Sequence, residues 1–206
     1  MGNQIKLSPK EAATAFEQSQ ANLKSYLDAV DDLGATVKSI HEAVFSDPIN
    51  AALVIVSKVL TNAGDAVNSG VSAFHTAFGE VASAWKSSDF AAGSAPSFAK
   101  PAFAGVIVSS KAPEHLEVET GKIDQLIEEL TSKHTVMRGK FEDIEQTIAN
   151  SKSWYIGDGA DKTRNTFATK VSPLKDDVAK AVTDLKNALE AEKANLLAKS
   201  SGRFVE

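Results

Sequence analysis

Four stretches of this chain repeat apolar residues at alternating steps of three and four, and this period constrains the fold more than any other feature. The most regular stretch steps by 4, 3, 4, 3, 4, 3 and 4. Its positions are Ile123, Ile127, Leu130, His134, Met137, Phe141, Ile144 and Ile148. A period near 3.5 residues places one stripe along an α-helix, and such a stripe packs against other helices. The sequence therefore predicts an all-α fold.

Two further helices are predicted in the first third of the chain. Ser8, Pro9 and Glu11 form a capping box that starts the first helix. Its stripe is Phe16, Leu23, Leu27, Val30, Leu33, Val37, Ile40 and Val44. The turn Phe45-Ser46-Asp47, followed by Pro48, ends this helix and begins the second. The second stripe is Leu53, Val56, Leu60, Ala63, Val67, Val71, Phe74, Phe78, Val81 and Trp85.

The fourth helix is predicted to begin near residues 158–160, after the turn Trp154-Tyr155-Ile156-Gly157. Its stripe is Phe167, Val171, Leu174, Val178, Ala181, Leu185, Leu189 and, less regularly, Leu196. Pro173 lies in its early turns and should kink it, because proline lacks a backbone donor.

Residues 87–117 differ in character from the helical stretches and form a connector. Ser, Ala, Gly and Pro dominate them, with Phe90, Phe98 and Phe103 interspersed. One short strand could form over 104–109. Because a plain linker would be less aromatic, we expect part of the connector to pack along the helices.

These elements predict one elongated four-helix bundle made of two tandem hairpins. The first hairpin covers residues 1–86, the connector 87–117 and the second hairpin 118–206. Each helix carries one apolar stripe, and two hairpins side by side would bury more of the stripes than one hairpin alone.

The composition removes several classes of function. There is no cysteine, so disulfides, thiol catalysis and thiolate metal sites are absent. The net charge is -5 and no basic face is evident, so nucleic acid is not an expected partner. The first residues lack the apolar core of a secretory signal, and the apolar run 51–60 is shorter than the roughly 20 residues of a spanning helix. Any export would therefore use a route without a cleaved signal peptide.

Neither catalysis nor a cofactor is expected. No two of the histidines, His41, His75, His115 and His134, have the i, i+4 spacing of a zinc site. The carboxylate pairs are adjacent residues on predicted helices and point apart. The stretch 157–161 superficially resembles a calcium loop, but it lacks the remaining ligands. We expect a protein that is not an enzyme and that binds neither metal nor cofactor.

Residues 118–199 resemble the WxG (ESAT-like) family of small helical hairpins that type VII secretion systems export. The resemblance lies in Ser153 to Gly157 after a heptad helix, in Phe167, and in the stretch Val171 to Leu174. The first half looks like a degenerate copy. Its opening, Leu7 to Glu11, is typical of the family, whereas Phe45, Ser46 and Asp47 replace the turn motif.

The resemblance implies a non-enzymatic protein of a type VII secretion pathway, secreted without a cleaved signal peptide. Family members pair into four-helix bundles, so two copies in one chain imply a monomer that mimics a dimer, or a higher assembly. The chain would be an exported substrate, or an adaptor for an effector, that acts through docking of helix faces. Trp154, Tyr155 and Gly157 would contact the secretion machinery or a co-secreted effector.

Two departures from the family pattern matter for this interpretation. The Trp-to-Gly spacing is one residue longer than usual. The usual export signal, Tyr followed four residues later by Asp or Glu, is missing, because Val30 follows Tyr26 and Gly159 follows Tyr155 at that distance. A bound partner could supply the signal.

Other interpretations compete with recognition. Trp154 could simply cap the bundle end while Gly157 supplies a backbone angle with positive φ, and this structural role is the favoured one. The apolar segments 51–60 and 103–108 could form a hidden tongue that inserts into membranes, as in helical pore-forming toxins; plain core packing is favoured over membrane contact. A phage or coat structural protein is a third alternative.

Overall fold

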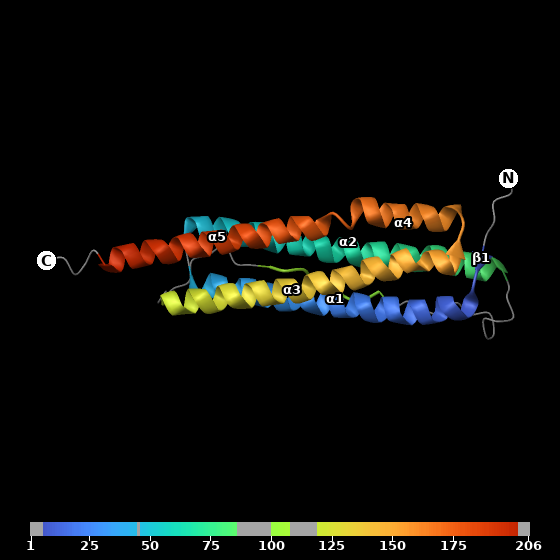
Figure 1. Ribbon diagram of the computed structural model, residues 1–206, viewed down its shortest axis with the longest axis horizontal. Coiled ribbons are helices and arrows are strands. Elements are labelled where there is room, and N and C mark those ends of the chain that lie inside the picture. Colours follow the sequence, from blue (N-terminus) through green and yellow to red (C-terminus); the bar gives the residue numbers. More distant parts are fainter. Residues whose placement is uncertain (1–5, 45, 86–99, 108–118, 202–206) are drawn as a thin grey trace. The chain divides into compact units, whose positions relative to one another are not determined.

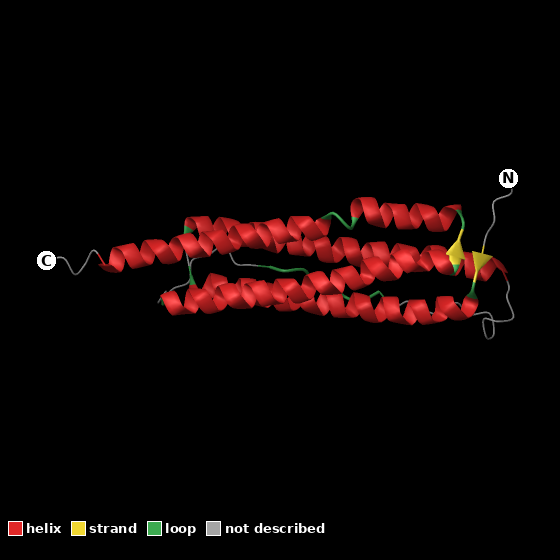
Figure 2. Ribbon diagram, viewed as in Figure 1, coloured by secondary structure: helices red, strands yellow, loops and turns green. Residues whose placement is uncertain are grey.

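The computed structural model describes residues 6–44, 46–85, 100–107 and 119–201, and helices dominate them (Figures 1 and 2). The helices are α1 (Pro9–Ala43), α2 (Asp47–Trp85), α3 (Thr120–Asn150), α4 (Asp158–Lys170) and α5 (Leu174–Ser201), with a short 3-10 turn at Ser151–Ser153. This architecture confirms the prediction of an all-α fold with four helical segments, the fourth of which is interrupted. None of the described helices combines the length and apolarity that crossing a bilayer requires.

The interruption in the fourth segment lies at Pro173, where a kink is predicted. The α4 helix ends at Lys170, and Ser172 N–H reaches back to the carbonyl of Phe167 at 3.0 Å. The α5 helix then begins at Leu174. Proline removes a backbone donor and disfavours helical geometry in the residue before it, so the helix ends and restarts here.

Contacts divide the chain into two compact units. Unit 1 contains residues 1–28, 64–103 and 139–175, and unit 2 contains residues 29–63, 104–138 and 176–206. Each unit draws on both predicted hairpins, so within each unit segments of the two hairpins pack together. The division of the chain at 86 and 118 stays a prediction.

The predicted stripes form the cores of the units. Every stripe residue of α1 is at most 4% exposed, as are those of α2 from Leu53 to Phe78; the side chains of Val81 and Trp85 lie outside the description. In α3, Leu126 is buried and Ile127 only half-buried, a shift of one position from the predicted stripe. In α5 the stripe residues from Val178 to Leu189 are buried, whereas Leu174 and Leu196 are half-buried.

A two-residue strand pair is the one β feature of the described residues. In unit 1, β1 (Lys6–Leu7) pairs antiparallel with β2 (Tyr155–Ile156). The pairing continues into a hydrogen bond from Ser8 N–H to the carbonyl of Trp154 at 3.0 Å. The start of the first hairpin is thus fastened directly to the turn of the second.

The predicted strand over 104–109 is wrong for residues 104–107, which adopt no regular structure; 108 and 109 lie outside the description. The expected packing of the connector along the helices is confirmed where it is described. In unit 1, the ring of Phe103 lies against Gly64, and Asn68 donates to the carbonyl of Pro101 at 3.0 Å. In unit 2, Val106 is 6% exposed.

Candidate functional site

The turn between α3 and α4, which carries the resemblance, is enclosed in an aromatic cluster of unit 1. Trp154 is 5% exposed and Tyr155 is 2% exposed. Both rings meet Phe78 of α2 edge-on, with ring centroids 5.6 Å and 5.8 Å away, and Phe74 lies 6.1 Å from Trp154. Phe16 of α1 packs on Phe78 at 4.3 Å. The first hairpin therefore supplies the walls around the turn of the second.

Gly157 makes the turn possible. Its backbone has φ 145° and ψ 164°, a conformation that side chains with a Cβ rarely adopt. Its carbonyl accepts the N–H of Asp161 at 3.0 Å, which starts α4. This geometry matches the structural role favoured from the sequence; a recognition role for Trp154, Tyr155 and Gly157 stays a prediction.

Tyr155 is held by hydrogen bonds through both its side chain and its backbone. Its hydroxyl donates to the carbonyl of Ala77 at 3.4 Å, and its own carbonyl accepts from Arg164 at 3.0 Å. Burial raises the pKa of the Tyr155 hydroxyl. The charge of Arg164 lowers this pKa, and the charge of Glu80 raises it. The residue is a neutral anchor at ordinary pH.

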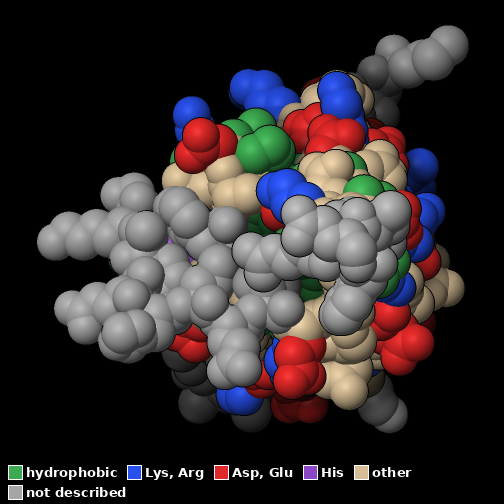
Figure 3. Space-filling model, turned by 90° about the vertical axis from the view of Figure 1, so that its left-hand side faces the viewer, with side chains coloured by type: hydrophobic (Ala, Val, Ile, Leu, Met, Phe, Trp, Pro, Cys, Tyr) green, Lys and Arg blue, Asp and Glu red, His purple; other side chains and the backbone are tan. Residues whose placement is uncertain are grey.

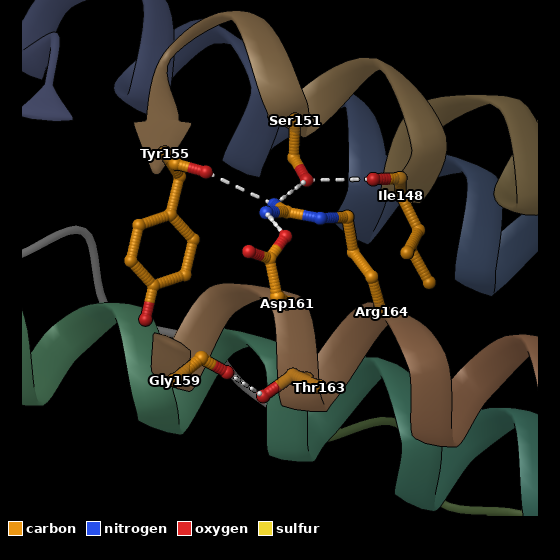
Figure 4. Close-up of polar contacts among 7 residues, drawn as sticks. All are labelled: Ile148, Ser151, Tyr155, Gly159, Asp161, Thr163 and Arg164. Atoms are coloured by element: carbon orange, nitrogen blue, oxygen red, sulfur yellow. Dashed lines mark hydrogen bonds and ion pairs between the residues drawn. The ribbon is translucent and has the colours of Figure 1, made fainter. Parts of the chain in front are cut away.

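Arg164 fastens the turn to α4 (Figure 4), and the predicted stripe of the fourth helix does not include it. The residue is 8% exposed. Its Nη1 donates to Ser151 Oγ at 2.9 Å and to the Tyr155 carbonyl at 3.0 Å, while Nη2 meets Asp161 Oδ1 at 2.7 Å. Ser151 Oγ in turn donates to the carbonyl of Ile148 at 2.6 Å. One guanidinium therefore joins α3, the turn and the first residues of α4.

A sequence signal for Arg164 did exist. Ala160, Arg164, Phe167 and Val171 step by 4, 3 and 4, so the stripe of the fourth helix extends back through the arginine. All four residues are buried. A charged residue at a stripe position requires buried acceptors, since an unpaired buried charge is very costly.

A cleft of about 400 Å³ lies between the end of α3 and α4. Its apolar lining is Ile148, Ala149, Phe167 and Ala168, and its polar lining carries both signs of charge: Glu145, Asp161, Lys152 and Arg164, with Asn165 and Ser172. An apolar patch bordered by polar groups is typical of surfaces that receive another chain or a small molecule.

At the equivalent place in the first hairpin, Phe45 lies outside the described residues. Ser46 precedes α2, and its carbonyl accepts the N–H of Asn50 at 2.8 Å. Asp47 is the first residue of that helix. The second helix thus starts at the predicted turn, but no capping bond from Ser46 is found among the described residues, because its buried hydroxyl oxygen has no hydrogen-bond partner there.

The histidines that the structure describes do not gather into a metal site. No group of three or more His, Cys, Asp or Glu in the described part of the chain is placed to hold a metal ion. His75 is 4% exposed, its ring contacts Ser19 Oγ at 3.2 Å and lies 3.9 Å from Phe16, and burial lowers its pKa to about 4. His134 is half-buried, and burial with Arg138 lowers its pKa. His115 lies outside the description.

Charges of both signs are interspersed on the surface. Lys133 pairs with Asp32 at 3.1 Å and Lys175 with Glu145 at 2.7 Å. In the face drawn in Figure 3, the described Lys and Arg side chains lie among Asp and Glu side chains rather than in a field of one sign.

None of the known protein families, characterised proteins or solved structures matches this chain.

Proposed function

We propose that this protein is a non-enzymatic component of a bacterial type VII secretion pathway, either an exported substrate or an adaptor that binds a co-secreted effector. The observation that carries the proposal is the Trp154–Gly157 turn with its surroundings. A helix–turn–helix with buried Trp154 and a Gly157 of positive φ is packed against α1 and α2 of the same unit.

In a WxG-like bundle, the first hairpin would take the place that a second chain occupies in the paired members of that family. Phe16 and Phe78 come from residues 1–86, whereas Trp154 and Tyr155 come from residues 118–206, and these rings share one cluster. This arrangement supports a monomer that mimics a dimer. It also supports a role in which the protein binds its partners through the outer helix faces and not through an active site.

The docking surface that fits this role best is the α3–α4 cleft. Because the turn's rings are buried, a partner that binds the folded chain meets exposed groups instead, and the cleft offers an apolar floor beside Lys152. An amphipathic helix of the effector or of the secretion machinery would place its apolar face there.

An export assay tests the proposal. A tagged chain is expressed in a bacterium with the cognate type VII genes and in an isogenic strain without the secretion ATPase. We expect the chain in the culture supernatant of the first strain only, with a cytoplasmic marker retained in the cells. Export should need the co-encoded partner, because neither Tyr26 nor Tyr155 is followed four residues later by Asp or Glu. Equal release from both strains would contradict the proposal.

A matched pair of variants tests the cleft. Ala168→Glu places a charge on the apolar floor, and Thr166→Glu places the same charge on an exposed position of α4 that is not part of the cleft lining. We expect the first variant to reduce partner-dependent export at least tenfold and the second to leave it unchanged. Equal effects of the two variants would show that the cleft is not the docking surface.

A second candidate, a helical membrane-active protein, has one observation in its favour. The two apolar segments 51–60 and 103–108 contact each other within unit 2 where they are described, through Ser57 and Val106. A liposome leakage assay separates the candidates. Dye release at low protein concentration would favour the membrane-active function over secretion.

A further inference from the structure

The acidic and basic side chains that line the α3–α4 cleft differ in whether the chain already pairs them. Glu145 Oε2 lies 2.7 Å from Lys175 Nζ, and Asp161 Oδ1 lies 2.7 Å from Arg164 Nη2. Both carboxylates of the lining therefore have a cationic partner within unit 1. Lys152 is exposed, and it makes no hydrogen bond or ion pair with any described residue. The charge of the lining that is free to meet a partner is thus positive.

Arg164 adds a second unused donor to the same lining. Its Nη1 and Nη2 are both engaged within the turn and α4 (Figure 4), whereas its buried Nε finds no acceptor in the described part of the chain. A buried donor without an acceptor is unfavourable. An oxygen acceptor that a partner brings against this guanidinium would therefore be favoured.

The turn and α4 also differ in charge from the rest of the chain. Residues 151–175 contain five Lys or Arg and two Asp, a net charge of +3, in a chain whose net charge is -5. A locally positive segment on an acidic protein attracts negative groups of a partner and repels positive ones. The apolar floor beside it, formed by Ala149, Phe167 and Ala168, requires that the same partner also present an apolar face.

We propose that the α3–α4 cleft selects an acidic amphipathic helix of a partner protein and that Lys152 determines this selectivity. The partner helix lays aliphatic side chains on Ala149 and Ala168, and an Asp or Glu at the border of its apolar face pairs with Lys152. The selectivity rests on the proposed function, in which the cleft is the docking surface for an effector or for the secretion machinery.

Three synthetic helical peptides serve as probes. They share one stripe of Leu and Ala and differ only at the positions that border this stripe, which are Glu, Gln or Lys. Each peptide is titrated to about 1 mM onto the isotope-labelled full chain, and the amide signals of Ala149 and Ala168 report occupancy of the cleft. We expect the Glu peptide to bind about tenfold more tightly than the Lys peptide, with the Gln peptide between them.

A matched pair of charge reversals assigns this preference to one residue. Lys152→Glu should reverse the order, so that the Lys peptide binds most tightly. Lys162→Glu, at an exposed position of α4 outside the cleft lining, should keep the wild-type order. Both substitutions lie on the surface, so neither should disturb the fold.

Several results would overturn the proposal. These are equal affinity for the Glu and Lys peptides, no shift of the cleft amides with any peptide, or the same response from both variants. Self-association of the wild type that Lys152→Glu removes would assign the cleft to a second copy and overturn a foreign partner.

The export assay separates failure of the selectivity from failure of the proposed function. Export that depends on the secretion ATPase but is unchanged in Lys152→Glu would refute the role of this lysine and leave the secretion function standing. A preference for the Glu peptide in a chain that both strains release equally would retain the selectivity and refute the secretion function.

Discussion

Replacing Arg164 by Met should destabilise the protein by about 3 kcal/mol. Met keeps most of the aliphatic volume but removes the donors to the Tyr155 carbonyl and Ser151 Oγ. Losing a buried acceptor's partner costs about 1–3 kcal/mol, and Ser151 is fully buried while Tyr155 is 2% exposed. The bond to Asp161 adds little, because that carboxylate side chain is 69% exposed and exposed pairs contribute about 0–1 kcal/mol.

Urea unfolding monitored by circular dichroism measures this change, and the melting temperature should fall by about 9 °C for a chain of this length. Two controls separate the parts of the interaction. Asp161→Asn, which removes only the exposed partner, should cost at most about 1 kcal/mol. Lys162→Met, at an exposed position of the same helix, should change stability by less than about 0.5 kcal/mol. A loss below about 1 kcal/mol for Arg164→Met, or an equal loss for Asp161→Asn, would refute the reasoning.

Three further predictions use the same unfolding measurement. Gly157→Ala should cost about 2 kcal/mol because of the backbone conformation at φ 145°, whereas Gly139→Ala, within α3 and with open space around it, should stabilise by about 1 kcal/mol. His75 binds a proton more weakly when folded, so stability should fall as the pH falls from about 6.5 to about 4, by about 3 kcal/mol at the lower value. His75→Asn should remove that part of the pH dependence, and identical urea midpoints for variant and wild type from pH 7 to pH 4 would contradict it. Phe16→Ala, which empties part of the ring cluster, should cost about 4 kcal/mol, and a cost under about 1 kcal/mol would show that the cluster collapses to fill the space.

The sequence was sufficient for the helices and their buried faces because those features depend on local period and capping. Ser8 and Pro9 set the start of α1, and Pro173 set the break between α4 and α5. The heptad predicted Ile127 where the structure buries Leu126 more deeply. A helix that packs on more than one neighbour buries a wider face than one seam, so the period alone cannot select between adjacent apolar positions.

Tyr26 is a second buried residue that the period did not select. It is fully buried beside Leu27, with its ring 5.6 Å from that of Phe141, and burial raises its pKa well above the usual value. The stripe predicted Leu27 and passed over Tyr26. Its burial depends on a residue 115 positions away in the sequence, which no local pattern encodes. The two-residue strands are equally invisible, because pairs such as Leu7 and Tyr155 are too short to show an alternation.

The motif suggests two roles for Trp154, packing within the fold and contact with a partner, and the burial of its ring separates them. For its ring to reach a partner, the turn would have to leave the aromatic cluster. That step would break the bond from Ser8 to the Trp154 carbonyl and disturb the bonds of Arg164, in addition to exposing two large rings. Exposing one such side chain alone costs about 1.5–3 kcal/mol, so a partner would have to provide several kcal/mol before gaining any contact. Recognition of the folded chain is therefore expected at surfaces that need no unpacking, namely Ile156, which is 37% exposed on the turn, and the adjoining α3–α4 cleft. A partner whose binding is abolished by Ala168→Glu but tolerates Trp154→Phe would follow from this reasoning, and the reverse pattern would mean that the turn opens.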